Sequence, residues 1–166
     1  MAVAGVDIGR ATESDLDGIL ELQAANQGER GGMLSASLSR AHVAEMIRER
    51  PLIVARRDDR VVGFLMNSTP AMNDGVPIVR AMLTAYPGTA DAYVYGPVCV
   101  KEDERGKQIA QAMFTELRHL QQGREGILFI RRDNPASLRA HAKMGMHEVA
   151  GFVFGGTECV VLSFLG

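Results

Sequence analysis

A glycine–proline pair interrupts the apolar segment 92–100, and it limits what this segment can form. The segment is rich in valine and tyrosine, which predicts a β-strand. Proline has no backbone N–H to donate to a neighbouring strand. Gly96 and Pro97 therefore predict a bulge, or a place where the pairing of this strand stops.

Strand-like and helical segments alternate along the rest of the chain. Apolar residues at helical spacing, N-capping residues and terminal glycines or prolines predict helices. Short apolar runs between turn residues predict strands. The predicted order is β-α-α-β-β-insert-β-α-β-α-β-β, with strands at 7–11, 52–56, 61–66, 92–100, 127–130, 147–154 and 158–164. Helices are expected at 13–25, 39–50, 78–86, 109–120 and 134–144, with a loop at Gly28, Gly31 and Gly32.

Length, charge and cysteine content exclude several classes of protein. The 166 residues have the length of one ordinary domain, so we expect a single domain over 1–166. A formal net charge of −2 argues against bulk binding of nucleic acid. Two cysteines rule out a disulfide framework and a four-cysteine zinc site. With no membrane-spanning run and no secretory signal in the sequence, we expect a cytoplasmic protein. The motifs H-E-x-x-H and C-x-x-C are also missing, so we expect no metal site.

The insert at 67–91 is long for a plain connection between two strands. Several prolines and glycines surround its short helical stretch. Such segments often serve as lids or binding loops, and a simple insertion is an equal alternative.

Residues 98–110 form the first segment that indicates a binding site, because their pattern predicts a strand, a charged turn and the start of a helix. The first backbone N–H groups of a helix have no partner within it and lie at the positive end of its dipole, so they bind phosphate well. Arg105 and Lys107 add positive charge, and Gly106 leaves room for a close approach. An ordinary solvated helix cap would have the same pattern.

Residues 134–146 form the second such segment. Asn134 and Pro135 have the pattern of an N-cap and a first helical position. Further along, Leu138 and His141 share the helix face that points toward the sheet. An inward histidine is more often a hydrogen-bonded core residue than a catalytic one.

Together the two segments resemble the GCN5-related N-acetyltransferase (GNAT) superfamily, whose members transfer an acetyl group from acetyl-CoA to an amine. The family's loop pattern Q/R-x-x-G-x-G/A matches Arg105, Gly106, Lys107, Gln108, Ile109 and Ala110. Its second pattern, N-x-x-S/A-x-x-x-Y-x-x-x-G-F, matches in spacing at Asn134, Ser137, His141, Gly145 and Met146. The resemblance covers about residues 7–164. It implies an α/β (α+β) GNAT fold with a central mixed, mostly antiparallel sheet of about 6–7 strands and about four flanking helices.

The resemblance also implies a cosubstrate and a set of site residues. Acetyl-CoA would place its pyrophosphate on residues 105–110, with Asn134 and Ser137 as further cofactor-binding residues. Backbone groups of Val98 and Val100 would bind the pantetheine, and an N–H near Val98 would polarise the thioester carbonyl. The acceptor would be an amine-bearing small molecule or peptide. Dimers are frequent in the family, which makes a homodimer one possible assembly and leaves the oligomeric state open.

Three positions depart from the family's pattern. Gln108 occupies the place of the loop's first glycine. His141 replaces the tyrosine that protonates the departing thiolate, and imidazolium can supply a proton as well. Gly96 stands where many relatives carry a glutamate base, so the identity of the base is left open. The candidates are Tyr93, Tyr95, Asp91 and Glu158. We expect Tyr95 and His141 to be the catalytic pair.

The sequence therefore predicts an acetyl-CoA-dependent N-acetyltransferase that works by direct attack in a ternary complex. A non-catalytic acyl-CoA-binding or sensor module on the same fold is the alternative, motivated by the departures at these positions. An acyltransferase that uses a longer acyl-CoA is a third reading.

Overall fold

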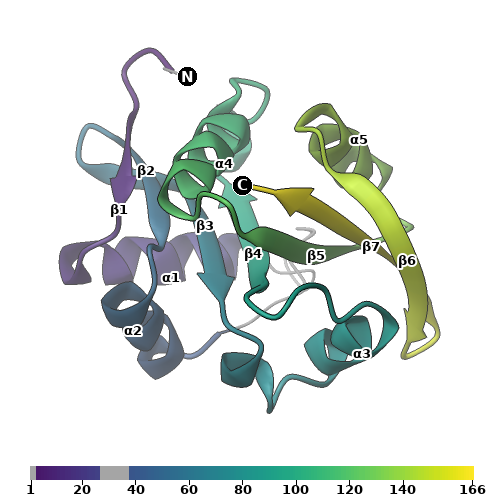
Figure 1. Cartoon of the computed structure of the whole chain (residues 1–166). Coiled ribbons are helices and arrows are strands. Elements are labelled where there is room, and N and C mark those ends of the chain that lie inside the picture. The colour runs from purple at the N-terminus through teal and green to yellow at the C-terminus, as the bar shows by residue number, and fades with distance from the viewer. Residues whose placement is uncertain (1–2, 27–37) are drawn as a thin grey trace. The chain divides into compact units, whose positions relative to one another are not determined.

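The computed structural model describes residues 3–26 and 38–166, and every strand and helix predicted from the sequence is present there (Figure 1). The strands are β1 (Asp7–Arg10), β2 (Ile53–Arg57), β3 (Arg60–Ser68), β4 (Tyr93–Val100), β5 (Glu125–Arg131), β6 (His147–Phe154) and β7 (Thr157–Leu165). The helices are α1 (Leu16–Ala25), α2 (Arg40–Glu49), α3 (Pro77–Ala85), α4 (Ile109–Leu120) and α5 (Pro135–Lys143). The loop predicted at Gly28, Gly31 and Gly32 lies outside the described residues.

The strands form one seven-stranded mixed sheet in the order β1-β2-β3-β4-β5-β7-β6. Neighbouring strands are antiparallel in β1–β2, β2–β3, β5–β7 and β6–β7, and parallel in β4–β5. This arrangement confirms the predicted fold class. The family resemblance implied about four helices, and the fifth, α3, is the one predicted within the insert.

Contacts divide the chain into two compact units. One unit comprises Met1–Asn67 and Gly96–Leu120, and the other comprises Ser68–Tyr95 and Gln121–Gly166. The chain passes from one unit to the other inside β4. The single domain expected over residues 1–166 stays a prediction.

β4 changes its environment at the glycine–proline pair. Its parallel pairing with β5 runs through Tyr93 and Val94, which are both buried. Gly96 has a φ of 102°, and Pro97 follows without an N–H to donate. The pairing with β5 ends before this point, but β4 itself continues to Val100 and neighbours β3 in the sheet, so the prediction holds for the β5 side only.

In the first unit, a two-residue turn at Asp58 and Asp59 joins β2 to β3, and both residues have the positive φ of a hairpin turn.

A close approach between the backbone of β3 and helix α4 fixes the position of α4. Gly63 of β3 lies beneath α4. A Cβ atom at Gly63 would come within 3.2 Å of Met113 Cε and 3.3 Å of Ile109 Cγ2. Glycine at this position therefore allows α4 to pack closely on β3.

In the second unit, the insert forms part of the core. Helix α3 packs against β6, and its buried Val79 and Met82 belong to the same hydrophobic core cluster as Val94, Ile127 and Val161. The helical stretch predicted in 67–91 is confirmed. Because α3 supplies core residues, this part of the insert is a structural element of the unit rather than a plain connection.

A buried carboxylate ties the end of the insert to the sheet. Glu125 of β5 is 8% exposed. It accepts hydrogen bonds from Tyr86 Oη at 2.7 Å, Ser163 Oγ at 2.5 Å and the Thr89 backbone N–H at 2.9 Å. Burial alone would raise the pKa of Glu125, but these hydrogen bonds outweigh it and the pKa is lowered. The carboxylate is therefore ionised at neutral pH and fixes the segment that leads into β4.

Replacement of Glu125 by glutamine should destabilise the protein by about 1–3 kcal/mol at neutral pH, because three donors lose a charged acceptor. The folded-state pKa lies below the ordinary 4.5. The ionised group therefore stabilises the fold above that value, and its contribution is lost as the pH falls through the folded-state pKa. Urea unfolding of both proteins should show a difference that shrinks in acid.

Glu148→Gln is the matched control for this measurement. Glu148 is an exposed carboxylate that pairs with Arg132 at 3.0 Å, and such a surface pair contributes less than about 1 kcal/mol. A Glu125→Gln protein as stable as the wild type at neutral pH would show that the carboxylate does not anchor the insert.

Candidate functional site

The loop between β4 and α4 brings six of the predicted site residues together, at 105–110. β4 ends at Val100, a short 3-10 helix covers Glu102–Glu104, and α4 begins at Ile109. The Ala112 N–H donates to the Gln108 carbonyl at 3.0 Å, so Gln108 is the cap of α4. The next amides along the chain are the first of the helix and have no acceptor within it.

Two residues of this loop have left-handed backbone conformations. The φ of Gly106 is 77° and that of Gln108 is 66°. No atom lies within 4 Å of where a Gly106 Cβ would be, so the space above this residue is open. Gln108 occupies the position at which the family pattern has glycine, and a left-handed conformation costs a non-glycine residue about 1–2 kcal/mol. The departure found in the sequence thus falls at a position where the backbone itself favours glycine.

Both cationic side chains of the loop are held by acceptors of the protein. Lys107 Nζ lies 3.0 Å from Glu104 Oε1, and Arg57 binds the same carboxylate at 2.6 and 3.1 Å. The hydrogen bonds from Arg57 and Lys107 lower the pKa of Glu104 to about 2. Arg105 donates from Nε to the Val100 carbonyl at 3.1 Å and from Nη2 to Asn26 Oδ1.

Three residues that support this loop were not identified from the sequence. Glu104 is three residues before Lys107, a spacing that favours ion pairs near a helix. That signal was available in the sequence. Arg57 and Asn26 are distant in the chain, so no local pattern could have identified them.

The second group of predicted residues lies on α5 and in the last part of β4 before Gly96. Asn134 Oδ1 accepts from the Ser137 N–H at 3.3 Å, which confirms the predicted N-cap. His141 is only 4% exposed. Its Nδ1 lies 2.8 Å from the Ser137 carbonyl and 3.3 Å from Ser137 Oγ, and its Nε2 lies 3.1 Å from Tyr95 Oη.

These contacts determine where the proton of His141 lies. A carbonyl oxygen can only accept, so Nδ1 carries the hydrogen that faces the Ser137 carbonyl. In a neutral ring Nε2 is then the acceptor, and Tyr95 donates to it. Burial lowers the pKa of His141, and the hydrogen bond to Ser137 offsets part of that effect. The neutral imidazole is therefore the form present at neutral pH.

Tyr95 is buried between aromatic neighbours. Its ring meets those of His141 and Phe164 edge to face, with centroid separations of 5.6 and 5.7 Å. Burial raises the pKa of its phenol, so the hydroxyl keeps its proton. Tyr95, Ser137 and His141 thus form one buried hydrogen-bonded group, and they belong to a different unit from residues 98–110.

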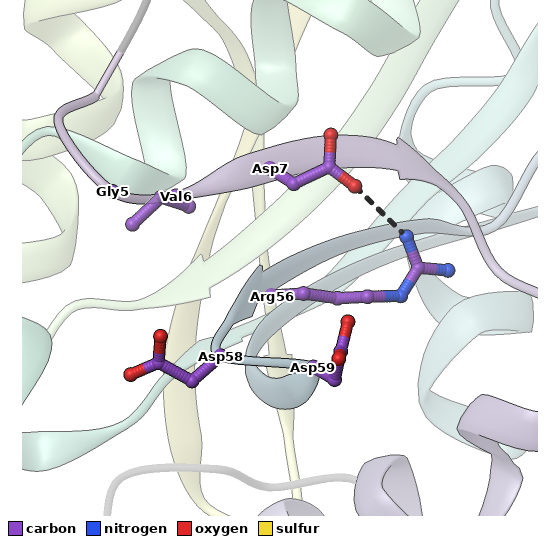
Figure 2. A pocket seen from close by; sticks show the side chains of 6 residues that line it. All are labelled: Gly5, Val6, Asp7, Arg56, Asp58 and Asp59. Atoms are coloured by element: carbon purple, nitrogen blue, oxygen red, sulfur yellow. Dashed lines mark hydrogen bonds and ion pairs between the residues drawn. The ribbon is translucent and has the colours of Figure 1, made fainter.

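A pocket of about 400 Å³ lies elsewhere in the first unit, and it contains none of the predicted site residues (Figure 2). Its lining comes from the two residues before β1, the start of β1, the end of β2 and the hairpin turn: Gly5, Val6, Asp7, Arg56, Asp58 and Asp59. Arg56 binds Asp15 at 2.9 and 2.5 Å and Asp7 at 3.4 Å. Its charge is thus already compensated, and the pocket offers no chemistry of its own.

The described residues contain no cluster of histidine, cysteine and carboxylate side chains that could hold a metal ion. Within the same part of the chain, no helix has the length and apolar character that a membrane crossing needs. Cys99 and Cys159 are free thiols, and both are buried.

The sequence model of the acetyltransferase (GNAT) family matches residues 19–146, which is more than half of the chain. The chain belongs to the GNAT family. With this membership comes the family's general activity, acetyl transfer from acetyl-CoA. No curated protein matches the chain in sequence.

Solved structures with the same fold include other GNAT proteins. Ard1 from Thermoplasma volcanium is 16% identical, with a TM-score of 0.72 over 97% of each chain. The ribosomal-protein-S18-alanine N-acetyltransferase from Escherichia coli is 12% identical, with a TM-score of 0.68 over 96% of this chain and 92% of its own. The yncA protein of Salmonella typhimurium, solved with its cofactor acetyl-CoA, is 16% identical, with a TM-score of 0.72 over 98% of this chain and 94% of its own.

The loop at the start of α4 fits the pyrophosphate of this cosubstrate. Its donors are the unpaired backbone N–H groups of a helix N-terminus, which is the chemistry that a phosphate requires. The open space above Gly106 leaves room for the ligand to approach the backbone.

Gln108→Gly should stabilise the protein by about 0.5–1 kcal/mol, because glycine adopts the left-handed conformation without the steric cost of a Cβ atom. Its affinity for acetyl-CoA should be equal to or higher than that of the wild type. Gln111→Gly, inside α4, is the control and should destabilise by about 1 kcal/mol. Thermal unfolding and titration calorimetry measure both effects, and a less stable Gln108→Gly protein would argue against strain at this position.

Proposed function

We propose that this GNAT protein is an N-acetyltransferase that transfers the acetyl group of acetyl-CoA to a primary amine. The acceptor is a small molecule or a peptide, and the amine attacks the thioester directly in a ternary complex. The observation that carries the proposal is the loop at the start of α4, with its left-handed Gly106 and Gln108 and its unpaired amides. A cytoplasmic location and a homodimer stay predictions.

The first part of the proposal concerns the pyrophosphate. Residues 105–110 bind it through backbone N–H groups, aided by the positive end of the α4 dipole. Arg105 and Lys107 contribute long-range charge, while their hydrogen bonds to Asn26, Val100 and Glu104 hold the loop in shape. On α5, the Asn134 cap and Ser137 are the proposed further contacts of the cofactor.

The second part concerns the thioester. The half-buried Val98 and Val100 lie after Pro97, beyond the point where β4 pairs with β5. Backbone groups of this stretch bind the pantetheine, and an N–H near Val98 stabilises the tetrahedral oxyanion. The Val100 carbonyl already accepts from Arg105, which connects this stretch to the pyrophosphate loop.

The third part concerns the protons. A neutral amine forms a bond to the acetyl carbon, and the C–S bond then breaks with its electron pair on sulfur. The attacking nitrogen must lose a proton and the thiolate must gain one. Tyr95 and His141 are the proposed catalytic residues for these transfers, which typically contribute about 10²–10⁴-fold to the rate.

A non-catalytic acyl-CoA-binding module is the second candidate function. Gly96 cannot act as a base, and both ring nitrogens of His141 already have hydrogen-bond partners. A protein that only senses acyl-CoA would need neither a general base nor a general acid. A transferase that prefers a longer acyl-CoA is a variant of the first proposal.

Calorimetric titration with acetyl-CoA tests the pyrophosphate site. Gly106→Asp should weaken binding strongly, because it places a negative charge beside the phosphates. Gly156→Asp is the matched control, since Gly156 has a φ of 79° in an equally open hairpin turn. If Gly106→Asp bound acetyl-CoA as tightly as Gly156→Asp, the assignment of this loop would be wrong.

Release of free CoA thiol over a panel of small amines and peptide N-termini separates the two functions. The transferase should release thiol with at least one amine, and acetyl-, propionyl- and longer acyl-CoA can be compared as donors. Tight binding of acetyl-CoA without turnover on any amine would favour the sensor module.

A further inference from the structure

Arg105 differs from the other cation of the loop at 105–110 in the charge of its partners. Its Nε donates to the Val100 carbonyl at 3.1 Å and its Nη2 donates to Asn26 Oδ1, and both of these oxygens are neutral. Lys107 is instead paired with the Glu104 carboxylate at 3.0 Å. Among residues 3–26 and 38–166, no carboxylate forms an ion pair with Arg105, so its positive charge is not compensated by any of them.

The guanidinium of Arg105 keeps donors for a ligand. A guanidinium has five N–H groups in a fixed plane. In the part of the chain that the structure describes, the contacts with Val100 and Asn26 use two of them, one on Nε and one on Nη2, which leaves three on Nη1 and Nη2. The edge of the plane that carries these three can bind two phosphate oxygens at once. The side chain is exposed, so a ligand can reach it.

Asn26 presents its side-chain oxygen to Arg105 in one orientation only. The residue follows α1, is 6% exposed, and donates from its backbone N–H to the Gln23 carbonyl at 3.2 Å. Its Nδ2 donates to the Leu22 carbonyl at 2.9 Å. A carbonyl can only accept, so the amide nitrogen must face Leu22 and the oxygen must face Arg105. Rotation of the amide by half a turn would lose both side-chain hydrogen bonds.

The helix that precedes Asn26 is itself held by the core. Ile19 and Leu22 of α1 are 0% and 6% exposed. The buried Gln23 accepts from the Leu38 N–H and donates to the Leu38 carbonyl, both at 3.0 Å. The oxygen that binds Arg105 is therefore fixed within the same compact unit that contains residues 105–110.

We propose that Asn26 is a positioning residue of the cosubstrate site, which orients Arg105 so that the remaining edge of its guanidinium binds the diphosphate of acetyl-CoA. This inference rests on the proposed binding of the pyrophosphate by residues 105–110, and it adds a direct contact to the long-range charge of Arg105. An arginine side chain loses much rotamer freedom when it binds a phosphate. Asn26 and Val100 restrict this side chain before the ligand arrives, so less conformational entropy is lost on binding.

Asn26→Leu removes the acceptor and keeps a side chain of similar size. The dissociation constant for acetyl-CoA should rise by about tenfold, because Arg105 keeps its charge but loses its orientation. In turnover the KM for acetyl-CoA should rise by a similar factor, while kcat at saturation stays within about twofold. Titration calorimetry and steady-state rates measure the two effects. A wild-type Kd in this variant would overturn the proposal.

Asn67→Leu is the matched control in the same unit. Asn67 is 0% exposed, its Oδ1 accepts from Arg50 Nε at 3.0 Å, and its Nδ2 donates to the Pro51 carbonyl at 3.3 Å. The same substitution there removes the same kind of bridge between an arginine and a carbonyl. Both variants should unfold at a lower temperature than the wild type, and Asn67→Leu should bind acetyl-CoA as the wild type does. An equal loss of affinity in both variants would mean that the effect reports on stability, which counts against the proposal.

Asn26→Asp is a second variant, which keeps the shape of the side chain and an oxygen toward Arg105. The carboxylate would form an ion pair with the guanidinium and offset the charge that binds the diphosphate. Affinity for acetyl-CoA should therefore fall in this variant even though the contact with Arg105 is kept. If Arg105 only braced the loop, the stronger contact would preserve or improve binding, and that result would refute the role of Asn26.

A double-mutant cycle tests whether Asn26 acts through Arg105. Arg105→Lys keeps the positive charge but replaces the planar fork with a point charge that cannot make the same contacts. In this background Asn26→Leu should weaken acetyl-CoA binding by less than about twofold, because the group that it orients is already gone. A loss as large as in the wild-type background would show that Asn26 acts by another route, contrary to the proposal.

The same titrations separate this inference from the proposed function. Binding that Gly106→Asp abolishes and Asn26→Leu leaves unchanged would keep the assignment of the loop and refute the role of Asn26. A wild-type protein that does not bind acetyl-CoA would refute both. Binding without turnover would favour the sensor module, and the expected changes in Kd would still decide the role of Asn26.

Discussion

The lack of an N–H at Pro97 is the constraint on which much of this chain depends. A strand needs its backbone groups paired, and β4 meets that need with β5 through Tyr93 and Val94 before Gly96 and Pro97 interrupt it. The two compact units divide at the same point. One strand thus supplies a buried phenol before the interruption and leads, after it, to the loop proposed to bind the pyrophosphate.

In each unit, the proposed functional residues are held by a polar group that can bond in only one way. The Ser137 carbonyl can only accept, so it fixes the proton of His141 on Nδ1. The Glu104 carboxylate accepts from Arg57 and Lys107 together, so it fixes the turn before α4. In both cases a short stretch of chain is held in its conformation by a hydrogen bond that involves the side chain of another residue.

The sequence predicts the parts of this structure that depend on near neighbours in the chain. Helical spacing, caps and turn residues identify every strand and helix of the described residues. Motif spacing identifies Gln108 and His141 as the residues that depart from the family pattern. It does not predict that α3 is part of a core, that Glu125 anchors the insert, or which hydrogen bonds His141 makes. Those features depend on residues far apart in sequence, and periodicity carries no information about such contacts.

The way in which Arg105 and Lys107 are held bears on the ionic conditions under which the loop would work. Lys107 is paired with the Glu104 carboxylate, whereas Arg105 donates to the neutral oxygens of Asn26 and Val100, so a diphosphate would be bound by backbone dipoles at short range together with the charge of Arg105. Mobile ions screen charges beyond about 8 Å at physiological ionic strength, and they affect contacts at hydrogen-bond distance far less. Occupancy of the loop would therefore depend less steeply on the salt concentration than that of a site built only from free lysines and arginines.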